Sequence, residues 1–101
     1  MTGKVRNVIR AAMAKRYPDI ATNAMMAYGC SAESLATDTN AEAVARTREE
    51  ILRILMLEFP DANTPILSDV MSLNPYTIRR MVERINRDSF QGRKWKLAKG
   101  I

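Results

Sequence analysis

A chain of 101 residues, 47% hydrophobic and 27% charged with a net charge of +5, predicts one globular domain over residues 1–101. One Cys and no His exclude an internal disulfide, a zinc site of His or several Cys, and a Ser-His or Cys-His nucleophile. A glycine-rich phosphate loop and any run of about 18 apolar residues are also missing from the sequence. We therefore expect no enzyme, no cofactor, no membrane span and a cytoplasmic location.

The first third of the sequence predicts helices separated by short breaks. Apolar residues recur at helical spacing over residues 4–16. Pro18 disfavours helical geometry at the residue before it, so we expect a break there and a second, short helix over residues 19–28. Gly29 can end that helix in the left-handed conformation. Ser31 can then open one further turn as an N-cap.

The longest helix is predicted near residues 39–58. Thr39 and Glu42 have the spacing of a capping box, which marks a helix start. Apolar residues then recur at helical spacing and widen to a broad face towards the end, as in a helix that contacts several neighbours. Pro60 stops it. No alternating strand pattern occurs, so the fold class is expected to be all-α, a bundle of about five to six helices.

Residues 64–87 predict two helices joined by a tight turn. Thr64 is expected to cap the first, with Pro65 in its first turn, and Asn74 is expected to cap the second, with Pro75 in its first turn. Because Pro75 would clash within one continuous helix, the chain must bend before it. The inner faces of the two helices are predicted to be Leu67, Val70 and Met71, then Ile78, Met81, Val82 and Ile85.

This segment matches the pattern of a helix-turn-helix, with residues 75–87 as the recognition helix. Small residues stand in the first helix and in the turn, and an aliphatic residue lies beyond it: Ser68, Ser72 and Ile78. Ser72 takes the place of the more usual Gly, so we expect its backbone to be in a less favourable geometry. Short apolar helix pairs also occur in ordinary bundles.

The outward face of residues 75–87 predicts contacts with DNA. Recognition helices read base edges with their N-terminal residues, and Arg can donate two hydrogen bonds to guanine. Arg84 and Arg87 come later and are expected at phosphates. The candidate residues of this segment are Asn74, Tyr76, Thr77, Arg79, Arg80, Arg84 and Arg87. For each Arg alone, a solvated helix face is the alternative.

The charge distribution fits a polyanionic partner. Residues 1–20 carry five Lys or Arg and one acid, residues 21–63 carry three Arg and seven acids, and residues 64–101 carry eight Lys or Arg and three acids. The basic tail, residues 89–101, contributes Lys94 and Lys96 as candidate phosphate contacts. Trp95 between them can dock on the core or stack on a base.

From about residue 24 to residue 85, the chain resembles the C-terminal DNA-binding domain of the bacterial replication initiator DnaA, a helical fold of the Trp-repressor-like class. The resemblance lies in "AYGCSAESL", then "VARTREEILRIL", then "TPILSDVMSLNPYTIRRMVERI". It implies that Arg46 and Arg48, at the start of the long helix, approach the DNA backbone or minor groove.

The sequence departs from the family in two segments. The loop "ATDTNAEA" is acidic where the family is basic, and "SLNPYTI" replaces the family's turn signature, with Thr77 retained. Recognition of the family's origin sequence is therefore not expected to carry over. Its ATPase activity is not expected either, because the sequence contains no nucleotide-binding module. We expect a small, nucleoid-associated regulator of transcription or replication that binds double-stranded DNA.

Two alternatives stay open at this point. One is a helical module that binds an acidic partner protein, with Met25 and Met26 lining a groove. The other concerns the oligomeric state, because a homodimer could form through the first helix although the sequence has no sustained heptad.

Overall fold

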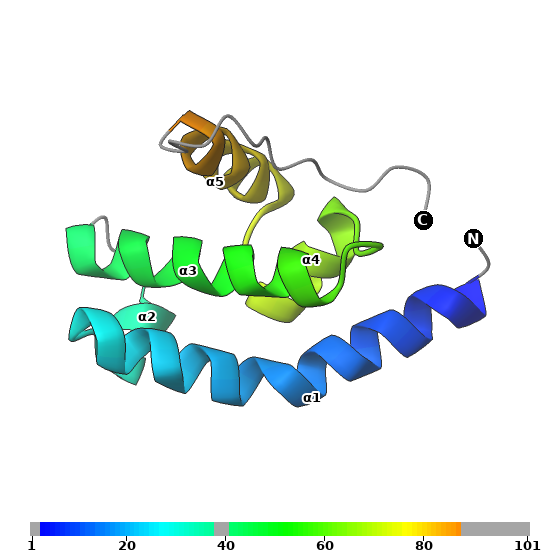
Figure 1. Ribbon diagram of the computed structural model, residues 1–101, viewed down its shortest axis with the longest axis horizontal. Helices are drawn as coiled ribbons and strands as arrows, with labels where there is room; N and C mark the ends of the chain where they lie inside the picture. Colours follow the sequence, from blue (N-terminus) through cyan, green and yellow to red (C-terminus); the bar gives the residue numbers. More distant parts are fainter. Residues whose placement is uncertain (1–2, 38–40, 88–101) are drawn as a thin grey trace.

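The computed structural model describes residues 3–37 and 41–87. These ranges contain five helices and no strand, which confirms the all-α class and a helix number within the expected range (Figure 1). The helices are α1 (Gly3–Tyr28), α2 (Ala32–Ala36), α3 (Glu42–Glu58), α4 (Thr64–Met71) and α5 (Pro75–Arg87). None of the helices in the described ranges is both long and apolar enough to cross a bilayer.

Helix α1 is continuous, so the break predicted at Pro18 is wrong, and α1 rather than α3 is the longest helix, with 26 residues against 17. An interior Pro costs a helix roughly 3 kcal/mol, because it lacks an N–H and its ring meets the preceding turn. Met13 and Ile20 are 0% and 3% exposed, on either side of Pro18 in sequence. Burying two such side chains contributes roughly 1.5–3 kcal/mol each, which offsets that cost. Figure 1 shows α1 bowed along the bundle.

The end of α1 and the start of α2 follow the sequence prediction. Gly29 has φ +65°, the left-handed geometry expected after a helix. The N–H of Cys30 donates to the carbonyl of Met25 at 2.9 Å, which satisfies one carbonyl of the last turn of α1. Ser31 is the N-cap of α2, and its hydroxyl accepts a hydrogen bond from the backbone N–H of Ser34 at 3.0 Å. Helices α1 and α2 are therefore joined by a short turn with capping hydrogen bonds on both sides.

Helix α3 begins two residues later than the predicted capping box requires. Its N-cap is Ala41, which has no side-chain cap bond, and Glu42 is the first helical residue. Thr39 lies outside the described residues. Glu42 pairs with Arg46 one turn later instead of reaching back as a cap. The helix ends at Glu58, and the N–H of Phe59 donates to Leu55 O at 2.8 Å, directly before Pro60.

The two later helices have different caps from each other. Asn63, not the predicted Thr64, caps α4, since its side-chain oxygen accepts from the N–H of Ile66 at 3.2 Å. Thr64 is instead the first helical residue and is buried. Asn74 caps α5 as predicted, accepting from the N–H of Tyr76 at 2.8 Å. Asn and Thr both favour this position, so a one-residue shift of the cap has little cost.

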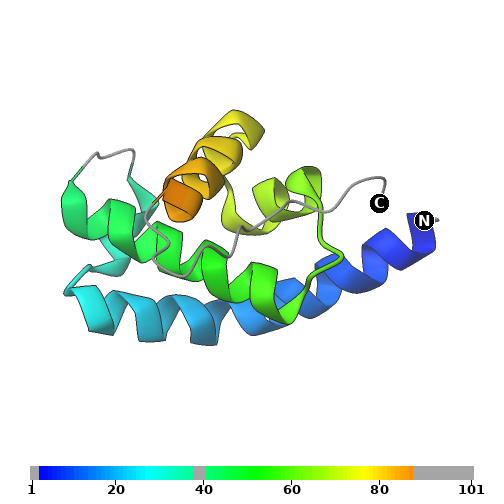
Figure 2. The ribbon, with the colours of Figure 1, turned by 45° about the horizontal axis from the view of Figure 1, so that its top comes forward.

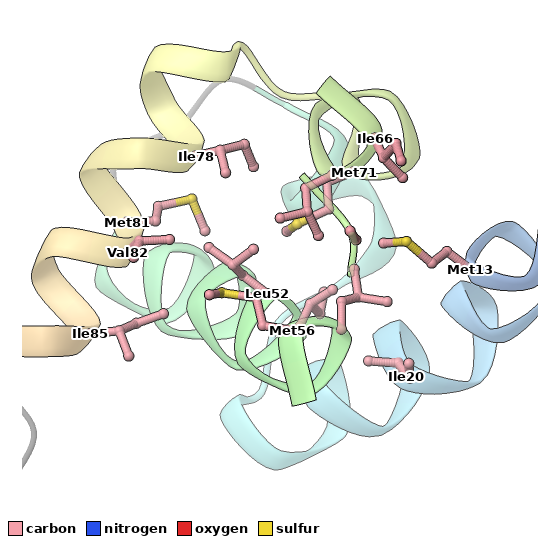
Figure 3. Packing of buried hydrophobic residues seen from close by; sticks show 14 of the residues in the cluster. Met13, Ile20, Leu52, Met56, Ile66, Met71, Ile78, Met81, Val82 and Ile85 are labelled. Carbon is pink, nitrogen blue, oxygen red and sulfur yellow. The ribbon is translucent and has the colours of Figure 1, made fainter. Parts of the chain in front are cut away.

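The core is formed where α3 packs between the other helices. In Figures 1 and 2, α1 lies along one side of α3, while α5 lies on the opposite side of it. Figure 3 shows the buried side chains converging from four helices: Met13, Ile20, Leu52, Met56, Ile66, Met71, Ile78, Met81, Val82 and Ile85. The four from α5 are the predicted inner face, which is confirmed. On α4, Leu67 and Met71 are buried and Val70 is partly buried, also as predicted.

Candidate nucleic-acid interface

A three-residue turn, Ser72–Asn74, joins α4 to α5 and fixes the direction in which α5 leaves the bundle. Ser72 has φ 55° and ψ 43°, the left-handed geometry that is unfavourable for a residue with a Cβ, as the sequence predicted. The N–H of Leu73 donates to Ser68 O at 3.1 Å, and the Ser68 hydroxyl donates to Leu73 O. Ser68 therefore ties the last turn of α4 to the turn from two directions.

Helix α5 presents a basic face away from the core. Its inner residues are buried, whereas four Arg and one Glu of the same helix are exposed. Figures 1 and 2 both place α5 at the edge of the bundle, with its outer side uncovered by the other helices. The exposed charged residues are Arg79, Arg80, Glu83, Arg84 and Arg87. This face is the one that the sequence assigned to DNA.

Tyr76 and Arg80 form a pair on the first turns of this face. Arg80 Nη1 donates to the Tyr76 hydroxyl at 3.0 Å, and the guanidinium carbon lies 5.7 Å from the centre of the Tyr ring. The hydrogen bond to Tyr76 is the main cause that raises the pKa of Arg80 above its ordinary value. Tyr76 is itself 61% exposed. The pair follows from i,i+4 spacing, a signal that was available in the sequence.

Arg79 differs from its neighbour because its side chain makes no ion pair or hydrogen bond within the part of the chain that the structure describes. It is exposed one residue after buried Ile78. Thr77 is half-buried and faces a cleft beside α2 rather than open solvent. Among the predicted base-reading residues, Arg79 therefore has the least competition for its guanidinium.

Arg84 and Arg87 lie further along α5 and have different surroundings. Arg84 Nη1 lies 3.0 Å from Glu49 Oε1 on α3, and the Glu49 side chain is only 14% exposed. This contact could not be predicted from the sequence, because the two residues are far apart in the chain. Arg87 is exposed in the last turn, where a cation interacts favourably with the helix dipole. Of the two, Arg87 has its charge less compensated.

The two arginines suggested by the family resemblance are held in unlike ways. Arg46 is exposed and donates from Nε and Nη2 to Glu42 Oε1 at 3.1 and 3.0 Å. Such a surface pair is weak, so the guanidinium can exchange it for a phosphate. Arg48 is half-buried, and its Nη2 donates to the carbonyls of Leu35 at 2.9 Å and Thr37 at 2.6 Å. It ties the end of α2 to α3, a structural role that sequence reasoning missed.

Lys94, Lys96 and Trp95 lie outside the described residues. The described ranges contain no group of three His, Cys, Asp or Glu residues that could hold a metal ion. No protein-family model matches this chain, and neither the curated proteins nor the solved structures include a match. The resemblance to the DnaA domain therefore stays a prediction.

Proposed function

We propose that the protein binds double-stranded DNA, with α4, the Ser72–Asn74 turn and α5 acting as a helix-turn-helix. The observation that carries the proposal is the two-sidedness of α5, whose inner face is buried while its outer face bears four Arg and one Glu. A helix of this kind at the edge of a bundle can enter a major groove without disturbing the core. Because phosphates dominate affinity, the excess of Arg also supplies the attraction.

We assign a different kind of DNA contact to each exposed residue along α5. Arg79, near the N-terminus and without a described partner, is assigned to a guanine edge, where two hydrogen bonds can form. Tyr76 orients Arg80 through the hydroxyl contact, which limits the directions in which Arg80 can donate. Arg87 and Arg46 are assigned to phosphates. The charge of Arg84 is partly neutralised by Glu49, so we assign it a weaker phosphate contact.

The remaining candidates lie at the margins of this interface. Asn74 caps α5 and so positions its first turn, and Thr77 lies beside the turn. Lys94 and Lys96 of the tail are proposed as additional phosphate contacts. Arg48 is assigned to holding α2 rather than to DNA, because its Nη2 is engaged by two carbonyls. In a cell, such a protein would be nucleoid-associated and would regulate transcription or replication.

Selection of bound sequences from a pool of random duplexes tests the proposal. We expect one enriched motif, and binding to unselected duplex that weakens steeply as salt rises, since each phosphate contact releases counterions. The spacing of any half-sites in the motif would also give the oligomeric state. Absence of salt-dependent binding to any duplex would contradict the proposal.

A second candidate function is a module that docks a partner protein with acidic groups. Its support is Met26, which is 78% exposed at the end of α1. Solvent-exposed Met is a common feature of adaptable binding surfaces. A chain that ignores duplex DNA but binds acidic polypeptides, with Met26→Ser abolishing that binding, would favour this function over the first.

A further inference from the structure

A cleft of about 820 Å³ is lined by residues of all five helices and of the Ser72–Asn74 turn. Ligand pockets in proteins are commonly about 300–1,000 Å³, so the cleft can enclose a small molecule. Its apolar walls come from the four helices that precede α5 and from the turn: Tyr17, Met25, Leu35, Ile51, Val70 and Leu73. It borders the proposed DNA interface at Asn74 and Thr77, which line it, whereas none of the exposed arginines of α5 does.

Among the described residues that line the cleft, Arg48 is the one that carries a charge. It is half-buried, and no carboxylate of the described residues lies within ion-pair distance of it. The two carbonyls that accept from its Nη2 are neutral, so they orient the guanidinium without compensating its charge. A partly buried cation with no carboxylate partner among the described residues favours an incoming anion.

Tyr17 supplies a second polar group on the cleft wall. Burial raises the pKa of its phenol, while the positive charge of Arg48 acts in the opposite direction. The phenol therefore stays protonated at neutral pH and can donate a hydrogen bond. Tyr17 and Arg48 both line this cleft, so one ligand bound in it can contact both residues.

We propose that this cleft binds a small organic acid with an apolar body, whose carboxylate pairs with Arg48 and accepts from the Tyr17 hydroxyl. One guanidinium matches one negative charge, which favours a monocarboxylate over a doubly charged phosphate monoester. The apolar walls favour an alkyl or aryl body by removing it from water. The inference is independent of the proposed DNA binding, and its test involves no nucleic acid.

Methionine methyl groups provide internal probes for the test. Met25 and Met71 line the cleft, whereas Met26, the next residue after Met25, does not and is largely exposed. The full chain, labelled with ¹³C at its Met methyl groups, is titrated with octanoate, with 2-naphthoate and with neutral octanamide. We expect saturable shifts at Met25 and Met71 for at least one acid, and no comparable shift at Met26. Octanamide should bind at least about tenfold more weakly than octanoate, the loss of one charge-assisted contact.

Two variants of Arg48 separate charge from structure. Arg48→Gln removes the charge and keeps an amide N–H donor on a shorter side chain, and it should weaken octanoate about tenfold while leaving octanamide unchanged. Arg48→Lys keeps the charge and should retain part of the octanoate affinity. Ala32 is an exposed residue of α2 that lines the cleft, and Ala32→Phe should weaken the binding of both ligands by filling part of the cleft. This variant tests the site if Arg48→Gln fails to fold.

Three results would overturn the site. Equal binding of octanoate and octanamide would remove the role of the Arg48 charge. Shifts at Met26 as large as those at Met25 would indicate non-specific association. The absence of any saturable shift at Met25 and Met71 with either acid would mean that the cleft does not take this class of ligand.

Discussion

Arg84 of α5 and Glu49 of α3 are joined across the bundle by an ion pair of 3.0 Å, with Glu49 only 14% exposed on its side chain. The pair holds the C-terminal half of α5 against α3. It also places a negative charge beside the helix that we propose enters DNA. Glu49 therefore has two opposed effects, because it anchors α5 while it weakens the attraction of this face for phosphates.

Glu49→Gln is expected to strengthen binding to any duplex by a few-fold, because it removes a negative charge and releases Arg84 for a phosphate. Fluorescence anisotropy with a scrambled duplex at two salt concentrations measures the affinity and its salt slope. Glu33→Gln, on exposed α2, is the matched control and should change little. Unchanged or weaker binding by Glu49→Gln would contradict the placement of this face on DNA.

Tyr76 is expected to act on DNA through Arg80. Tyr76→Phe removes the hydroxyl that accepts from Arg80 but keeps the ring beneath the guanidinium, so it should reduce affinity for the preferred site less than Arg80→Ala does. The double variant should lose little more than Arg80→Ala alone, because the two residues act as one unit. A double-mutant cycle on the preferred duplex measures the coupling. Full additivity would instead give Tyr76 an independent contact with DNA.

Ser72→Gly is expected to raise the free energy of unfolding by about 0.5–1 kcal/mol. A left-handed non-Gly residue costs roughly 1–2 kcal/mol, and the greater freedom of Gly in the unfolded chain returns part of this. Urea denaturation followed by circular dichroism measures the change. Ser68→Ala is the companion variant and should lower stability by about 1 kcal/mol, since it removes the bond to Leu73 O. A loss of stability with Ser72→Gly would mean that the Ser72 side chain has a stabilising role.

Pro18→Ala is expected to stabilise the protein by about 1–3 kcal/mol, because Pro18 lies inside α1 and withholds one helical hydrogen bond. The same urea experiment tests it. Ala11→Pro, at an exposed position of the same helix, should destabilise by a similar amount. If Pro18→Ala lowers stability, the curvature of α1 contributes to packing against α3.

The sequence predicted the parts of the fold that local chemistry decides. Gly29, Ser31 and Asn74 end or begin helices through groups close to them in the chain, and each has its predicted place. The helix break predicted at Pro18 was wrong because that prediction used only the local backbone preference at a proline. The burial of residues on both sides of Pro18 depends on contacts with α3 and α4. The shift from Thr64 to Asn63 had a smaller cause, since either residue can cap the helix.

The sequence predicted which face of α5 is exposed, but not the side-chain contacts that its arginines make. The buried and exposed faces of α5 follow from its periodicity alone. The partners of the arginines do not, because Glu49 and the carbonyl of Leu35 reach Arg84 and Arg48 only through the packing of α3 against α5 and α2. Within the described ranges, the Arg79 guanidinium has no partner, whereas Arg84 and Arg48 do. Residue type alone could not distinguish these arginines.

The most direct measurement of the central claim is a titration of wild type and Arg79→Ala against the selected duplex and a scrambled duplex at one salt concentration. Arg79 makes no described contact with the core, and Ala is a good helix former, so folding should be preserved. Arg6→Ala, at an exposed position of α1, is a control that also removes one positive charge. We predict a loss of about 1–3 kcal/mol on the selected duplex for Arg79→Ala, with a much smaller loss on the scrambled one. An equal loss on both duplexes, or none on either, would contradict base recognition by α5.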